Sequence, residues 1–231
     1  MNRFTQRSYL RDLRDSIILK DIVQHYKVRS ISELKALMGI FRESLACRLS
    51  HRSLERAMSD QISIATVGKF LGYGQGAYLT FQLQKFSFKT RERINSEKKA
   101  YLVDNGFYPS IKVGGQEDFG RLLENFIFIT LLRQGLRPNL DFFYYQTKAG
   151  REVDFLTLKN GRPDSLIQVC WSLSDSSTLE RGLSALASAA IDLSIASTTI
   201  VTWQDMAVHS RNGITIEVVP VAEFLARDIL G

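Results

Sequence analysis

Apolar residues recur at spacings of three and four along some stretches of the chain and alternate with polar residues along others, which predicts a mixture of helices and strands. Residues 8–29 combine an apolar stripe with charged positions, as is typical of one or two amphipathic helices. Ser30 and Glu33 fit a capping box, so a further helix is expected through about Arg48.

Two shorter helices are predicted over 52–58 and 64–73, with Ser50 and Ser63 before them and a tight turn between them. This arrangement is typical of a helix-turn-helix, with 64–73 in the recognition position. Residues 77–88 alternate like a strand, 91–99 fit a basic hairpin loop, and 100–103 fit the returning strand, which together predict a winged helix. Several glycines weaken the recognition helix, at positions 68, 72, 74 and 76.

The stretch from 119 to 171 has the clearest pattern. Residues 119–135 have helical periodicity and end at a glycine. Residues 152–158 and 164–171 fit two strands, and Asn160-Gly161 between them favours a hairpin turn, so antiparallel pairing is expected. One face of the first strand would carry Glu152, Asp154, Leu156 and Leu158, and one face of the second would carry Leu166, Gln168 and Cys170.

Glu124 on the helix would then lie near Asp154 and Gln168 on the strands. This arrangement resembles the core of the restriction-endonuclease-like, or PD-(D/E)xK, nucleases, where carboxylates hold Mg²⁺ and a lysine assists the attacking water. The resemblance implies Glu124 and Asp154 as metal ligands. The positions of the E-x-K motif hold Gln168, Val169 and Cys170 instead, and a neutral thiol cannot replace an ammonium group. The pattern therefore predicts a nuclease-like fold with a degenerate catalytic site.

The remaining residues fit the closing part of an α/β domain. We expect a helix over 178–193, strands over 198–202 and 214–219, and a final helix over 221–230. Asp205 and His209 fall in a loop after Trp203, and a surface hydrogen-bonding pair is expected there in preference to a site. For Trp171 we expect packing in preference to ligand stacking.

Composition narrows the class of protein. The chain has 231 residues, of which 45% are hydrophobic, enough for one large domain or two small ones with packed cores. Two cysteines and three histidines make neither a disulfide framework nor a zinc site. The N-terminus does not fit a signal peptide, and the longest apolar run, 126–132, is too short to span a bilayer. A cytoplasmic protein without a membrane segment is expected.

The net charge of +6 is concentrated in one part of the chain. Residues 42–99 contain 11 lysines and arginines against 5 acidic residues, and the rest of the chain is balanced. A basic segment of this kind predicts either contact with nucleic-acid phosphates or simply a solvated face. The candidate DNA-contacting residues are Lys69, Lys89, Arg91, Arg93, Lys98 and Lys99.

The order of these parts resembles a family of predicted bacterial and archaeal ATPases. Its members have an AAA-type module, then a winged helix, then a nuclease-like domain of unknown function. The resemblance is carried by YLRDLRDSIILKDIVQHYKVRS, KKAYLVDNGFYPSI, GRLLENFIFITLLRQG, GREVDF and LIQVCWSLSD. The phosphate-binding motif G-x-x-x-x-G-K-[ST] is absent from this sequence, so no ATP site and no ATP hydrolysis are expected. The resemblance implies a C-terminal portion of such a protein.

The sequence thus predicts an α/β (α+β) chain with a helical segment and winged helix over 1–99 and a restriction-endonuclease-like mixed-sheet domain over 100–231. The expected role is a non-catalytic DNA- or partner-binding module of an AAA-type ATPase, without a cofactor. One alternative is a Mg²⁺-dependent nuclease, in which Gln168 is a third ligand and Lys148 or Arg151 replaces the missing lysine. Another is a pure protein-assembly scaffold, which would have no salt-dependent affinity for DNA.

Overall fold

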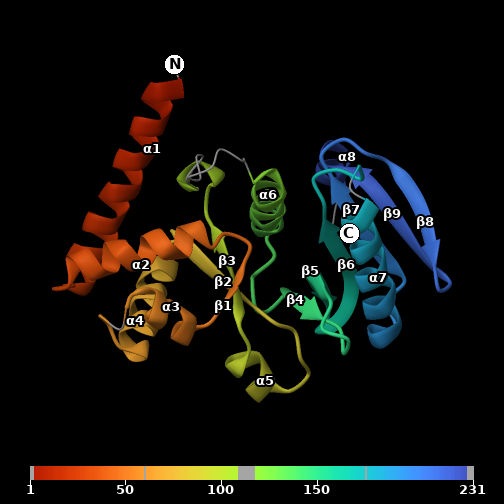
Figure 1. The fold of residues 1–231 in the computed structure, drawn as a ribbon, viewed down its shortest axis with the longest axis horizontal. Coiled ribbons are helices and arrows are strands. Elements are labelled where there is room, and N and C mark those ends of the chain that lie inside the picture. Colours follow the sequence, from red (N-terminus) through yellow and green to blue (C-terminus); the bar gives the residue numbers. More distant parts are fainter. Residues whose placement is uncertain (1–2, 60, 109–117, 175, 228–231) are drawn as a thin grey trace. The chain divides into compact units, whose positions relative to one another are not determined.

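The computed structural model describes residues 3–59, 61–108, 118–174 and 176–227. It is a mixed α/β structure with two sheets, and the chain forms two compact units (Figure 1). The first unit comprises 1–82 and 97–117, and the second comprises 83–96 and 118–231. The chain therefore passes between the units at three points. Within the described ranges, no helix is both long and apolar enough to cross a membrane.

The first unit surrounds a three-stranded sheet of order β1-β3-β2 with helices. Its elements are α1 (Arg3–Ile17), the π-helix η1 (Ile18–Gln24), α2 (Ile31–Glu43), β1 (Arg48–Leu49), α3 (His51–Ala57), α4 (Ile64–Gly76), β2 (Thr80–Gln84), β3 (Lys98–Leu102) and the 3₁₀ turn η2 (Asn105–Phe107).

Two of the predicted helix starts are confirmed. The Ser50 side chain accepts a hydrogen bond from the Ser53 N–H, and the Ser53 hydroxyl accepts one from the Ser50 N–H, which is a reciprocal capping box at α3. The Ser63 hydroxyl accepts a hydrogen bond from the Thr66 N–H and caps α4. Both caps satisfy backbone donors that the first turn leaves without partners.

The predicted start of α2 after Ser30 is confirmed, but the predicted capping box and the predicted end are wrong. Ser30 makes no capping hydrogen bond with its side chain. The helix ends at Glu43 and does not reach Arg48. Ala46 has a left-handed φ of 57°, and its N–H donates to the carbonyl of Ala100 on β3. The helix therefore ends early because the backbone that follows it hydrogen-bonds to β3.

The predicted basic hairpin loop over 91–99 is also wrong. Residues 90–95 form the helix α5 (Thr90–Asn95), and its start is stabilised by Ser87, whose hydroxyl accepts from the Lys89 N–H and donates to Glu92. Lys98 and Lys99 belong to β3, the central strand of the sheet, where Lys99 pairs with Arg48. Because β3 has β1 on one side and β2 on the other, these two lysines belong to the sheet and not to a loop.

The glycines of α4 allow close packing and do not end the helix, which continues to Gly76. A Cβ atom on Gly74 would lie 2.5 Å from the Thr80 hydroxyl, and one on Gly76 would lie 2.5 Å from the Tyr26 hydroxyl. At Gly72 a Cβ would meet nothing within 4 Å. Gly74 and Gly76 therefore permit contacts that any larger residue would block.

The second unit is built on a six-stranded mixed sheet of order β4-β5-β6-β7-β9-β8. Besides α5, its elements are α6 (Phe119–Arg133), β4 (Phe142–Gln146), β5 (Glu152–Lys159), β6 (Arg162–Val169), α7 (Ser176–Leu193), β7 (Ser197–Thr202), β8 (Ala207–Arg211), β9 (Ile214–Pro220) and α8 (Val221–Ala226). The antiparallel β5–β6 hairpin is confirmed, with Asn160 and Gly161 both at positive φ as a two-residue turn requires.

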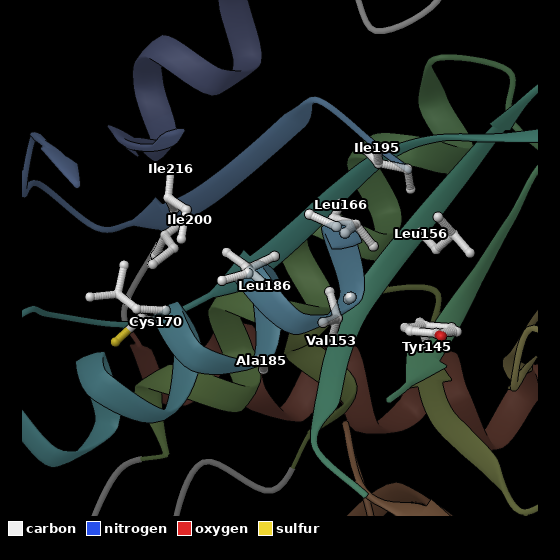
Figure 2. Packing of buried hydrophobic residues seen from close by; sticks show 14 of the residues in the cluster. Tyr145, Val153, Leu156, Leu166, Cys170, Ala185, Leu186, Ile195, Ile200 and Ile216 are labelled. Carbon is white, nitrogen blue, oxygen red and sulfur yellow. The ribbon is translucent and has the colours of Figure 1, made fainter. Parts of the chain in front are cut away.

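Helices cover both faces of this sheet. On one face Phe142 of β4 packs edge-on against Phe128 of α6 and against Phe155 of β5. On the other face lies an apolar cluster that includes Leu166 of β6 and Leu186 of α7 (Figure 2). Burial of these side chains is the main source of stability for the second unit.

The predicted alternation along β5 is interrupted. The pairing with β4 steps by two residues from Phe143 to Tyr145 but by three from Leu156 to Val153, so β5 contains a bulge. Val153 and Leu156 consequently enter the same apolar cluster, although strict alternation put them on opposite faces. The predicted common face of Leu166, Gln168 and Cys170 is supported, because Leu166 and Cys170 join this cluster while Gln168 and Cys170 line one cavity.

Sequence patterns missed two strands, β4 and β8. In β8 every residue is at least partly exposed, so the strand lacks an apolar stripe. The signal that marks it is the Asn212-Gly213 turn, where both residues have positive φ and β8 joins β9 antiparallel. The last helix is confirmed as far as Ala226, and the predicted end at 228–230 lies outside the described residues.

The glycines of α4 provide a matched pair of substitutions. Gly74→Ala should lower the free energy of unfolding by about 1–3 kcal/mol, because its Cβ overlaps the Thr80 hydroxyl. Gly72→Ala should raise it by about 0.5–1 kcal/mol, because alanine favours the helix and nothing obstructs the methyl group. Urea denaturation measures both, and equal effects of the two substitutions would contradict the packing described for α4.

Candidate functional site

Asp154 and Gln168 lie beside each other on the β5–β6 hairpin, one step beyond the paired residues Phe155 and Ile167. The Gln168 Nε2 donates to the Asp154 Oδ2 at 2.6 Å, and the backbone N–H of Val169 donates to the same oxygen at 2.9 Å. Asp154 is only 4% exposed. A buried carboxylate needs donors or a cation, and here β6 supplies two N–H donors.

The orientation of the Gln168 amide follows from this contact. A carboxylate accepts hydrogen bonds, so the NH₂ group faces Asp154 and the amide oxygen faces away. That oxygen, Oε1, is buried and has no hydrogen-bond partner among the described residues. A metal ligand at this position would instead present an oxygen toward the ion that it shares with the aspartate. Gln168 thus acts as a hydrogen-bond donor to the carboxylate.

The predicted third member of the group, Glu124, is half-buried on α6. In the part of the chain that the structure describes, no group of three or more histidine, cysteine, aspartate or glutamate side chains is placed to hold a metal ion. The structure therefore brings Asp154 and Gln168 together, as the sequence predicts.

Cys170 occupies the position at which the nuclease pattern has lysine. Its thiol lies 3.1 Å from the carbonyl oxygen of Ser172, to which it donates a hydrogen bond. Figure 2 shows its side chain at the margin of the apolar cluster. The position thus holds a small buried group without the reach or the charge of a lysine.

A cavity of about 440 Å³ lies beside this pair, between β6 and α7. Gln168 and Cys170 line it, and so do Arg151 and, from α7, Arg181. The alternative lysine, Lys148, does not line it: its side chain is 91% exposed and lies 3.9 Å from Asp192. Of the two substitutes named from the sequence, only Arg151 borders the cavity. Sequence reasoning missed Arg181, because α7 reaches this cavity only through the β6–α7–β7 crossover.

Trp171 lies in the middle of an aromatic stack. Its ring centroid is 4.6 Å from that of Phe119 and 5.0 Å from that of Trp203, and both pairs are nearly parallel. The expectation of packing is therefore confirmed for Trp171.

The expected pair of Asp205 and His209 is not formed. The Asp205 carboxylate instead accepts a hydrogen bond from the backbone N–H of Leu173, at 2.7 Å. The Nε2 of His209 is buried without a hydrogen-bond partner among the described residues. His209 also lies on the strand β8 and not in a loop. Asp205 therefore stabilises the chain after β6.

The six basic candidates are distributed over three places. Lys69 is exposed on α4 in the first unit. Lys89 and Arg91 are exposed at α5 in the second unit, where the Arg93 guanidinium lies 5.9 Å from the Phe143 ring centroid. Lys98 and Lys99 are in β3, and Lys99 is only 1% exposed. The six residues thus belong to α4, to α5 and its start, and to β3, and burial removes Lys99 from contact with a large ligand.

A second cavity, of about 310 Å³, lies between α4 and residues 26–30, which connect η1 to α2; we call it the α4 groove. Three exposed cations line it, namely Lys27, Arg29 and Lys69, and its lining contains no acidic residue. Tyr26 and Tyr73 stack in its wall with ring centroids 3.9 Å apart, and Lys69 lies over the Tyr73 ring. Sequence reasoning missed Lys27 and Arg29, because they precede α2 and meet α4 only in the folded unit.

Two domain families match the chain. Residues 2–117, half of its length, match the family described as domain of unknown function DUF8612. Residues 119–224 match the family described as domain of unknown function DUF4143. The chain therefore belongs to the DUF8612 family and carries a DUF4143 domain after it.

Two curated relatives are themselves uncharacterized. One, from Methanocaldococcus jannaschii, is 32% identical over 205 residues, which are 87% of this chain and 45% of the relative. The other, from Haemophilus influenzae, is 24% identical over 148 residues, 63% of this chain and 36% of the relative. The chain thus spans less than half the length of these relatives.

Among solved structures, one match is a complex of Thermococcus gammatolerans McrB AAA+ hexamers with bound McrC. The match has 14% sequence identity and a TM-score of 0.28, and it covers 78% of this chain and 46% of that chain. A likeness at this level supports no conclusion about fold or partners.

The contact between Asp154 and Gln168 predicts how a carboxylate at position 168 would change the free energy of unfolding. In Gln168→Glu, a second carboxylate would replace the donor that lies 2.6 Å from Asp154 Oδ2. The free energy of unfolding at neutral pH, without divalent cations, should fall by about 1–3 kcal/mol, because a donor is lost and two like charges meet. Gln75→Glu, on the exposed side of α4, makes the same change of charge and should be nearly neutral. Equal stability of the two variants would rule out the hydrogen bond as described.

Proposed function

We propose that this chain is a non-catalytic nucleic-acid-binding module. The observation that carries the non-catalytic part is the pairing of Asp154 with the Gln168 amide and the Val169 N–H. A nuclease of the PD-(D/E)xK type needs the corresponding oxygens to share a divalent cation. Here protein donors satisfy the Asp154 oxygen, and a buried thiol occupies the place of the lysine.

The first unit is proposed to contain a winged helix. Support comes from the order α2, β1, α3, α4, β2, β3 and from the sheet order β1-β3-β2, in which α3 and α4 are joined by a short turn. The segment that would form the wing, 83–96, packs with the second unit. Phe86 of this segment joins the apolar cluster, and its N–H donates to the Tyr144 carbonyl at 2.7 Å. In this proposal the wing does not contact DNA.

The DNA-binding surface is proposed to be the α4 groove. Lys27, Arg29 and Lys69 would contact phosphates there, and no acidic side chain in the lining opposes them. Few polar side chains on α4 are suited to read base edges, namely Ser63, Thr66 and Lys69. Phosphate contacts carry no base information, so binding with little sequence preference is expected.

The module is further proposed to work within a longer AAA-type ATPase. The support is the resemblance of the ordered sequence motifs to such proteins, together with the greater length of the uncharacterized relatives. In this arrangement the ATPase part hydrolyses nucleotide, and the module described here binds DNA.

Binding to duplex DNA should depend strongly on salt. With three phosphate contacts, a plot of log affinity against log salt concentration should have a slope of about −3, because each contact releases nearly one counterion. Replacing Lys27, Arg29 and Lys69 together by alanine should weaken binding to all sequences alike and bring the slope close to zero. Fluorescence anisotropy with labelled duplexes of different sequence measures both effects.

The matched control is the double variant Lys89→Ala/Arg91→Ala, which removes two exposed cations at α5. It should keep most of the salt dependence. If the double variant flattens the slope of log affinity against log salt concentration and the triple variant leaves it unchanged, the DNA contacts lie at α5 and not in the α4 groove. Absence of any salt-dependent affinity in the unmodified protein would favour the scaffold alternative.

The protein should not cleave DNA in the presence of Mg²⁺ or Mn²⁺. The double change Gln168→Glu/Cys170→Lys restores the residue types of the nuclease motif and tests whether the geometry is retained, with weak nicking of supercoiled plasmid as the expected gain. Metal-dependent nicking by the unmodified protein that disappears in Asp154→Ala would instead establish the nuclease alternative, with Arg151 as the cation beside the cavity.

A further inference from the structure

The first unit contains another cavity, of about 200 Å³, which we call the α2 cavity. One face of α2 forms a wall of it through Lys35, Met38, Gly39 and Arg42, which follow one another at helical spacings. The other lining residues come from α1 and η1, from Leu79 and the first residue of β2, and from the end of β3 and η2: Arg14, Asp15, Ile18, Leu79, Thr80, Leu102 and Phe107.

Positive charge in the lining exceeds negative charge. Arg14, Lys35 and Arg42 face a single acid, Asp15. The Asp15 carboxylate is engaged by Arg14, whose Nε and Nη2 donate to its Oδ1 at 3.0 and 2.7 Å. Arg42 Nε is buried and has no hydrogen-bond partner among the described residues. Arg42 therefore lines the cavity and carries a buried donor that the described protein groups leave unsatisfied.

The surroundings of Arg42 destabilise its charge. Burial lowers the pKa of its guanidinium, and the nearby positive charge of Arg14 lowers it further, against the opposing effects of Glu43 and Asp15. A half-buried cation with a buried unpaired donor costs free energy unless a negative group is bound to it. An anion in the cavity would offset this cost.

The rest of the lining is apolar and limits the size of a ligand. Ile18, Leu79, Leu102 and Phe107 are buried side chains of the core. A cavity of roughly 150 Å³ is enough for benzene in a protein core, so the α2 cavity has room for one ring or a short chain plus a charged group. A strongly hydrated inorganic ion would leave the apolar part of the wall without contacts.

We propose that the α2 cavity binds a small organic oxyanion, that is, a carboxylate or phosphate carried on a short apolar group. Arg42 makes the main contact with the oxyanion, Arg14 and the exposed Lys35 flank it, and the apolar part lies against Ile18 and Phe107. Gly39 leaves the space open: a Cβ atom there would meet nothing within 4 Å. This inference does not depend on the proposed DNA binding.

The test uses the full chain with benzoate, phenyl phosphate and inorganic phosphate as probes at constant ionic strength. Binding is followed by ¹H–¹⁵N chemical-shift changes and by the melting temperature, which rises when a ligand binds only the folded state. Saturable binding of benzoate or phenyl phosphate is expected, tighter than that of inorganic phosphate, with shifts centred on residues 35–42. Absence of saturable shifts with both organic probes would overturn the proposal.

Variants separate this site from general charge effects. Arg42→Gln should weaken binding at least tenfold. Gly39→Leu should abolish it by filling the cavity, whereas Gly39→Ala should stay within about threefold of the unmodified protein. Arg11→Gln, which removes a 64% exposed charge one turn away on α1, is the matched control and should bind normally. Undiminished binding by Arg42→Gln or by Gly39→Leu would contradict the proposed site. If Arg42→Gln does not fold, the comparison of Gly39→Leu with Gly39→Ala tests the site by itself.

Discussion

The buried carboxylate of Asp154 constrains the chemistry of the second unit. A carboxylate withdrawn from water must be met by a cation or by hydrogen-bond donors, and the choice decides what the surrounding residues can do. Here the Gln168 amide and the Val169 N–H meet it, both from the neighbouring strand β6. These hydrogen bonds join β5 and β6 at the end of the hairpin that lies opposite its turn. The cost is the buried Gln168 oxygen, which lacks a partner among the described residues. The polar groups of Gln168 and Val169 thus stabilise the buried carboxylate within the sheet.

Features that depend on neighbouring residues could be predicted from the sequence. The Asn160-Gly161 turn, the caps at Ser50 and Ser63, and the meeting of Asp154 with Gln168 all follow from local rules of turn chemistry, capping and strand register. The failures have non-local causes. The bulge in β5 depends on the pairing with β4, and α2 ends early because Ala46 joins the sheet. Tertiary contacts of this kind override local propensity.

The same distinction applies to the candidate sites. Charge counting indicated residues 42–99, but it could not separate exposed lysines from Lys99, which a central strand buries. Nor could it identify Lys27 and Arg29, which come close to α4 only in the folded unit and line the α4 groove with Lys69. The α2 cavity has no sequence motif at all. Arg14 and Arg42 belong to different helices, and only the packing of these helices brings the two arginines into the lining of one cavity. The residue types therefore indicated which kinds of ligand the chain could bind, whereas the fold determined which residues line the same groove or cavity.

Because the Gln168 amide and the Val169 N–H donate to one Asp154 oxygen, we expect that oxygen not to bind a divalent cation. Paramagnetic Mn²⁺ tests it directly, because a bound ion broadens the amide signals of the nearest residues. The Gln168 side-chain NH₂ and the Val169 backbone N–H should keep their line widths, relative to distant amides, as Mn²⁺ is added to the full chain. Selective broadening of these two signals, reversed by excess Mg²⁺, would contradict it and would show that Asp154 still binds a divalent cation.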